Sequence, residues 1–203
     1  MLKNASIFLT TIGKAEKMRR FSQFFGKKLD NSNHKLSKVS AKDLNITTSE
    51  TPEKFMHLKD EIVAFLIDKL QDINFLEREI FARSQKLKNP KEPNQVQPGE
   101  TELWDEYAAR YKELLTPIAF NPLVGGSNSF GNPAKYDYLS NPDTEIFFIM
   151  KSSNRAVVET RYKYGIGVVQ KHQFVLKKEA ENWKIESKKY GFENETTWYK
   201  DAI

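Results

Sequence analysis

The hydrophobic pattern of this chain changes its period once, just after Phe120, and no other feature of the sequence constrains the fold as strongly. Before Phe120, apolar residues recur at every third or fourth position, which is the spacing of one face of an α-helix. After it, apolar and polar residues alternate, as along a half-buried strand. Helices followed by antiparallel strands make an α+β domain, and we predict that the N-terminal helices pack on a strongly bent antiparallel sheet.

Two long helices are predicted ahead of that change. Thr51-Pro52-Glu53 is a typical helix start, with Thr as the cap, Pro in the first turn and Glu favoured by the helix dipole. Apolar residues at helical spacing continue this helix to about residue 88: Phe55, Leu58, Ile62, Phe65, Leu66, Ile73, Leu76 and Ile80. After a proline-rich linker, Thr101 is the expected cap of a second helix over about residues 101–116.

The alternating segments predict antiparallel strands over residues 145–190. The inward positions of one strand are His172, Phe174 and Leu176. The Glu-Ala-Glu-Asn stretch that follows is typical of a hairpin turn. In the next strand we expect Trp183 and Ile185 to be buried on the side that faces the helices.

Charge divides the chain into regions. Residues 1–50 carry ten Lys and Arg against four Asp and Glu, and their composition predicts a basic, partly helical N-terminal extension and linker. Residues 51–203 form the predicted domain. Within it, residues 100–145 carry eight Asp and Glu against three Lys and Arg. This acidic middle is compatible with a basic partner, although solvated faces of ordinary helices give the same pattern.

The absence of cysteine narrows both the chemistry and the compartment. It removes disulfides, thiol nucleophiles and Cys-ligated zinc together, and it fits a reducing compartment. No stretch approaches the roughly 20 apolar residues that a membrane helix needs, and the apolar start of the chain is not followed by a cleavage site. We therefore expect a cytoplasmic protein without a membrane partner.

Few residues offer a site for catalysis or for a metal ion. None of the three histidines has the spacing of a metal site, so neither a metal nor a cofactor is expected. His172 is the strongest candidate for a general base, because its strand parity points it inward, but a core histidine satisfied by a hydrogen bond is the favoured interpretation. The Gly165-x-Gly167 pair lacks the context of a dinucleotide site, and no serine motif supplies a nucleophile.

Lysine, arginine and phenylalanine are interleaved over residues 17–28, which is one pattern of nucleic-acid binding. An exposed amphipathic helix with a basic face is the favoured interpretation. Direct binding of nucleic acid is therefore not expected.

The second half of the chain carries a pattern that resembles a known family. It consists, in order, of Pro133-x-x-Tyr136-Asp137, Glu145 before an apolar strand, an Ala-Val-Val-Glu-Thr strand, Phe174-x-Leu176-Lys177-Lys178, Trp183-x-Ile185-x-x-Lys188-Lys189 and Trp198. Over roughly residues 103–203 the chain thus resembles the nuclear transport factor two-like fold immunity proteins of bacterial polymorphic toxin systems. Glu186 stands where an aspartate is expected, and Asn182 where glycine is common.

The resemblance implies a cone-shaped α+β domain that has no enzymatic activity and neutralises a cognate toxin by stoichiometric binding. Such toxins are frequently nucleases, which need a basic surface for their substrate. Acidic groups speed association with such a basic surface and form charge pairs with it, while aromatic residues anchor the centre of the interface. The predicted toxin-binding residues are Glu102, Asp105, Glu106, Tyr136, Asp137, Tyr138, Asp143 and Glu145.

The Tyr136-Asp137-Tyr138 triplet has two interpretations. In the resembled fold it is a corner leading into the sheet, where Asp137 caps or turns the chain and one tyrosine packs inward. If the triplet is extended, both tyrosines share one face and form a contact patch beside Asp143 and Glu145.

The alternative hypothesis is a small-molecule-binding protein of the same fold, or an enzyme of the isomerase or dehydratase type. It rests on relatives of this architecture that act on ligands inside the cone, and the fold alone does not decide. An open pocket that converges on His172 and a tyrosine favours this alternative. A cone filled by Phe, Leu and Trp side chains favours the immunity protein.

Overall fold

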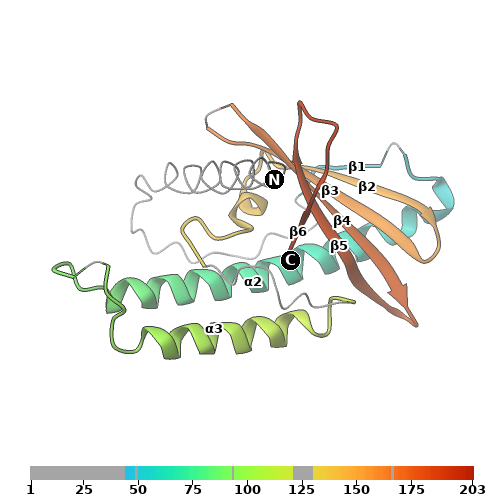
Figure 1. Ribbon diagram of the computed structural model, residues 1–203. Coiled ribbons are helices and arrows are strands. Elements are labelled where there is room, and N and C mark those ends of the chain that lie inside the picture. Colours follow the sequence, from blue (N-terminus) through green and yellow to red (C-terminus); the bar gives the residue numbers. More distant parts are fainter. Residues whose placement is uncertain (1–43, 49, 93, 121–129, 166) are drawn as a thin grey trace, which may run out of the picture. The chain divides into compact units, whose positions relative to one another are not determined.

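The computed structural model describes residues 44–48, 50–92, 94–120, 130–165 and 167–203 (Figure 1). Every described residue belongs to one compact unit, residues 37–203. The predicted helical part of the N-terminal extension lies outside the described residues.

Long helices precede most of the strands, as the change of period predicts. The helical elements are the 3-10 helix η2 (Glu53–Leu58), α2 (Lys59–Leu87), α3 (Glu100–Leu115) and the 3-10 helix η3 (Asp137–Ser140). The strands are β1 (Ile46–Thr47), β2 (Glu145–Ser152), β3 (Arg155–Lys163), β4 (Val169–Glu179), β5 (Asn182–Phe192) and β6 (Tyr199–Asp201). The two predicted helices and the α+β class are thereby confirmed.

Neither predicted helix cap has the expected role. Among the described residues, no side chain caps the 3-10 turn η2 that begins the first helix. The Thr51 hydroxyl instead donates to the carbonyl O of Phe148 at 2.8 Å and accepts from the N–H of Met150 at 3.1 Å, so it ties the helix start to β2. The second helix begins before Thr101, directly after Gly99, whose φ of +84° is a conformation that favours glycine.

The strands form one six-stranded sheet in the order β1-β2-β3-β4-β5-β6. From β2 to β6, each strand pairs antiparallel with the next, which confirms the predicted antiparallel strands of residues 145–190. β1 pairs parallel to β2, so the whole sheet is mixed, and this corrects the prediction of an entirely antiparallel sheet. Two residues of extended backbone in a polar segment are too few to produce an alternating pattern.

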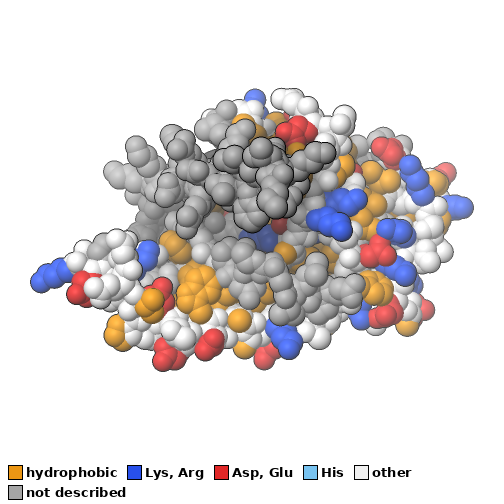
Figure 2. All heavy atoms as spheres, in the orientation of Figure 1, with side chains coloured by type: hydrophobic (Ala, Val, Ile, Leu, Met, Phe, Trp, Pro, Cys, Tyr) orange, Lys and Arg blue, Asp and Glu red, His pale blue; other side chains and the backbone are white. Residues whose placement is uncertain are grey.

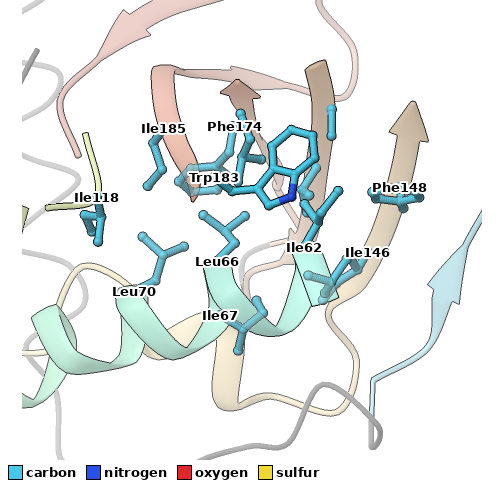
Figure 3. Close-up of a cluster of buried hydrophobic side chains, with 14 of the residues drawn as sticks. Ile62, Leu66, Ile67, Leu70, Ile118, Ile146, Phe148, Phe174, Trp183 and Ile185 are labelled. Carbon is cyan, nitrogen blue, oxygen red and sulfur yellow. The ribbon is translucent and has the colours of Figure 1, made fainter. Parts of the chain in front are cut away.

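The hydrophobic core lies between α2 and one side of the sheet (Figure 3). Leu66 and Leu70 point from α2 toward the sheet, where Phe174, Trp183 and Ile185 face them. Trp183 is 5% exposed and Ile185 is 1% exposed, which confirms the predicted burial of both.

α3 packs along the second half of α2, as Figure 1 shows. A second apolar cluster joins the two helices and consists of Leu76 and Ile80 from α2 and Leu103 and Tyr107 from α3. Within the described ranges, no helix combines the length and the apolar character that a membrane span requires.

Candidate functional site

A β-bulge in β5 turns the side chain of Lys188 into the interior. Successive residues of β4 pair with Ser187 and then with Ile185, so Glu186 is an extra residue in β5. One extra residue reverses the side of the sheet that the following side chains face. Lys188 therefore lies opposite Phe174 on the buried side and is only 3% exposed.

The ammonium group of Lys188 binds residues of β6 and just beyond it. Its Nζ lies 2.6 Å from Oδ2 of Asp201 and donates to the backbone O of Ala202 at 3.3 Å. It also lies 5.0 Å from the centre of the Tyr136 ring and 5.8 Å from that of Phe174, so aromatic rings form a wall beside the charge. We call residues 199–203, which bring Asp201 and Ala202 to this place, the covering segment.

A second lysine reaches the covering segment from the corner before η3. Lys135 Nζ donates to the backbone O of Ala202 at 2.6 Å and lies 5.8 Å from the centre of the Tyr136 ring. Tyr111 of α3 adds a further bond, because its hydroxyl donates to the backbone O of Ile203. Two ammonium groups thus converge on the same carbonyl oxygen.

Glu77 of α2 adds a carboxylate that is 1% exposed. Its Oε2 accepts from the backbone N–H of Lys135 at 2.7 Å, and its Oε1 accepts from the Tyr107 hydroxyl at 3.4 Å. Burial raises the pKa of Glu77, and the N–H of Lys135 and the charges of both lysines oppose this rise. We call Glu77, Lys135, Lys188 and Asp201 the buried charge cluster; Glu77 and Lys188 are buried, and Lys135 and Asp201 are half-buried.

The protonation of Lys188 changes near neutral pH. Burial lowers the pKa of Lys188 to about 7, the charge of Lys135 adds to this shift, and Asp201 opposes it. A lysine in this condition holds an anion when it is protonated and serves as a base or a nucleophile when it is neutral.

Two buried polar atoms beside the cluster have no hydrogen-bond partner among the described residues, and they are the Tyr136 hydroxyl and Nδ1 of His172. His172 is 7% exposed, and its ring stacks on that of Tyr138 with 5.0 Å between the centroids. Burial and the charge of Lys188 lower the pKa of His172 to about 3, so the ring is neutral at pH 7. The predicted inward direction of His172 is confirmed, but the predicted hydrogen bond is missing at Nδ1.

Cavities occur in other parts of the described chain. One of about 570 Å³ lies between α2, α3 and the β4–β5 turn, against Phe65, Leu114 and Trp183. Two of about 310 and 300 Å³ adjoin Val157 and Leu103, respectively. None of these three cavities reaches His172. The described residues also contain no group of three His, Asp or Glu side chains placed to hold a metal ion.

The Tyr136-Asp137-Tyr138 triplet is a corner, and both tyrosines are buried. Asp137 begins η3, and its Oδ1 lies 2.5 and 2.8 Å from two nitrogens of Arg78 and 2.7 Å from the amide nitrogen of Asn74. Tyr136 is 1% exposed and Tyr138 is 6% exposed. The extended alternative is wrong because the backbone forms a 3-10 turn. The corner interpretation predicts that one tyrosine packs inward, whereas both are buried. Neither tyrosine therefore lies on a surface that a partner reaches.

The predicted acidic residues fall into two groups on different sides of α2. Glu102, Asp105 and Glu106 lie on α3, and acidic side chains are visible along that edge in Figure 2. Asp143 and Glu145 follow η3, which lies across α2 from α3 in Figure 1, and both are exposed. The structure therefore does not bring the two groups together.

Glu106 differs from its neighbours because two arginines hold it. Its carboxylate oxygens lie 2.6 Å from the two terminal nitrogens of Arg83, and Oε1 lies 3.1 Å from Arg110. These bonds, above all those from Arg83, lower the pKa of Glu106 to about 2. Glu102 and Asp105 are exposed, and neither has an ion pair in the described part of the chain.

Lys188 and Glu77 are the functional candidates that the sequence pattern misses. Alternation counted from Trp183 and Ile185 predicts that Lys188 faces outward, and only the bulge reverses this. The burial of Glu77 could have been predicted from the sequence. Glu77 lies four residues after Ile73 and three before Ile80, within the apolar stripe of the helix.

Comparison of the chain with protein-family models, with curated proteins and with solved structures finds no match. The functional argument therefore rests on the chain's own residues.

Proposed function

We propose that this chain is an immunity protein of the nuclear transport factor two-like fold, which binds a basic toxin protein and blocks it stoichiometrically. The order of helices and sheet is compatible with that fold. One observation carries the proposal: on α3, an exposed aromatic ring is flanked by carboxylates that have no ion pair in the described part of the chain.

The aromatic ring is that of Trp104, which is 36% exposed and packs against Phe130 with 4.2 Å between ring centroids. Glu102 and Asp105 lie in the same helical turn and are exposed. An aromatic anchor among charged side chains is typical of the residues that dominate binding energy at interfaces. The carboxylates would speed association with a basic surface, such as the one a nuclease needs for its substrate.

Packing near His172 supports a binding protein over an enzyme that uses this histidine. The ring is stacked on Tyr138, and its pKa of about 3 makes it a weak base at physiological pH. Phe148, Phe174 and Trp183 belong to the core that fills the space between the sheet and α2.

Co-expression with the product of the neighbouring upstream gene tests this proposal. An immunity protein restores growth to cells that produce the toxin, and the two proteins purify together. If the wild-type chain neither rescues growth nor co-purifies, the proposed function is wrong.

Two charge reversals of equal size test the binding surface. Glu102→Lys with Asp105→Lys changes the α3 group, and Asp143→Lys with Glu145→Lys is the matched control on the other side of α2. We expect the α3 pair to slow association and to flatten its salt dependence, while the control pair has little effect. Unchanged binding by the α3 variant contradicts this surface and leaves the immunity function standing.

A further inference from the structure

The interior beside Lys188 has the groups of a polar binding site, and the chain itself occupies it. The Asp201 carboxylate lies 2.6 Å from Lys188 Nζ, and the Ala202 carbonyl accepts from both Lys188 and Lys135. Both lysines also lie within 6 Å of the centre of the Tyr136 ring, at 5.0 and 5.8 Å. The covering segment therefore supplies oxygen acceptors at a place where two ammonium groups meet.

Unused hydrogen-bonding atoms point to a ligand larger than the present occupant. The Tyr136 hydroxyl and His172 Nδ1 are buried without a partner in the described chain, and both residues interact electrostatically with Asp201. Native proteins rarely leave buried polar atoms unpaired. Two such atoms beside the buried charge cluster therefore indicate a site where a ligand would supply the missing hydrogen-bond partners.

The covering segment is attached in a way that permits it to separate. β6 has three residues, and among the described strands it lies at the edge of the sheet and pairs only with β5. Its polar bonds to the interior come from Asp201, Ala202 and Ile203. Its apolar contacts are the stacking of Tyr199 on Tyr190 and the packing of the partly buried Ile203 against the core. Short elements at a sheet edge open at a lower free-energy cost than the core strands do.

We propose that the covering segment is an exchangeable occupant and that the site beneath it binds a small monocarboxylate, for which the Asp201 side chain stands in. Without Asp201, the remaining charged members of the cluster are Lys135, Lys188 and Glu77, whose formal charge is +1 when Lys188 is protonated. A monocarboxylate neutralises this charge, whereas a phosphate dianion leaves an unpaired negative charge in buried surroundings. The proposal does not depend on toxin binding.

Butyrate is a suitable probe, because it is a small monocarboxylate. Its binding to the full-length chain is measured by saturation-transfer NMR. The binding of inorganic phosphate is measured for comparison. We expect Asp201→Asn to bind butyrate at least about tenfold more tightly than the wild type, because the internal carboxylate is replaced by a neutral group of the same shape. Adding Lys188→Met to Asp201→Asn should abolish binding. Adding Lys177→Met instead, at an exposed lysine of β4, is the matched control and should leave binding unchanged.

Three results overturn the proposal. They are the absence of butyrate binding to both the wild type and Asp201→Asn, binding that Lys188→Met leaves intact, and tighter binding of phosphate than of butyrate. Circular dichroism confirms the fold of each variant. If Lys188→Met fails to fold, Lys135→Met in the Asp201→Asn background takes its place and must weaken butyrate binding.

Discussion

Lys188 Nζ lies 2.6 Å from Asp201 Oδ2, and the Lys188 side chain is only 1% exposed. Removing two charges from water costs several kcal/mol, and their attraction seldom exceeds that cost by much. Hydrophobic residues at both positions would stabilise the fold about as well. Folding stability alone therefore does not account for the bulge that turns Lys188 inward.

Stability should increase with pH from about 7 to 9 because of Lys188. The pKa of Lys188 is about 7 in the folded chain, against an ordinary value of 10.5, so between these values the unfolded chain binds one more proton. The free energy of unfolding then rises by up to about 1.4 kcal/mol per pH unit. Lys188→Met should remove this rise. Urea denaturation from pH 7 to 9 measures the free energy of unfolding of both chains. An equal rise in Lys188→Met would show that Lys188 is not its cause.

His172 should lower stability in acid. Its pKa is about 3 in the folded chain, against an ordinary 6.5, so between these values the unfolded chain binds the extra proton. The free energy of unfolding therefore falls as the pH decreases below 6.5. His172→Phe keeps a ring against Tyr138 and should lose less stability than the wild type between about pH 6.5 and 4. The free energy of unfolding of both chains is measured against pH by chemical denaturation. If it falls equally in the wild type and in His172→Phe over this range, His172 is not held neutral in the folded chain.

Hydrophobic periodicity was enough to predict the layers of the fold. Burial of apolar side chains is the main favourable term in folding. The spacing of the apolar residues can be read directly from the sequence. The stripe through Leu66 and Ile73 located the first helix, and the alternation through Trp183 and Ile185 located a strand with the correct buried face.

Features that depend on distant partners were not predictable in this way. Thr51 has the chemistry of a helix cap, yet its hydroxyl bonds to Phe148, which is 97 positions away in the chain. The direction of Lys188 depends on one extra residue in β5, for which alternation gives no signal. The turning role of Asp137 was predicted, but its bonds to Arg78 of α2 were not, because they exist only after the corner has packed on the helix.

Leu66→Ala should lower the free energy of unfolding by about 2–5 kcal/mol, because it leaves a cavity in the core. Leu66 is fully buried between α2 and the sheet. Met56→Ala removes an apolar side chain that is 36% exposed and should change stability much less. Chemical denaturation of both variants makes the comparison, and similar losses would contradict the placement of the core.

Reversing Glu106 should destabilise α3, whereas reversing Asp105 should not. Glu106→Lys removes two bonds of 2.6 Å to Arg83 and places a third positive charge beside Arg83 and Arg110. Asp105 is exposed and has no ion pair in the described part of the chain. The thermal midpoint of Glu106→Lys should therefore fall below that of Asp105→Lys, which should match the wild type. Because salt screens exposed charges, the difference should be larger at about 0.02 M than at about 0.5 M NaCl. Equal midpoints for the two variants at low salt would show that the arginine bonds to Glu106 do not stabilise the helix pair.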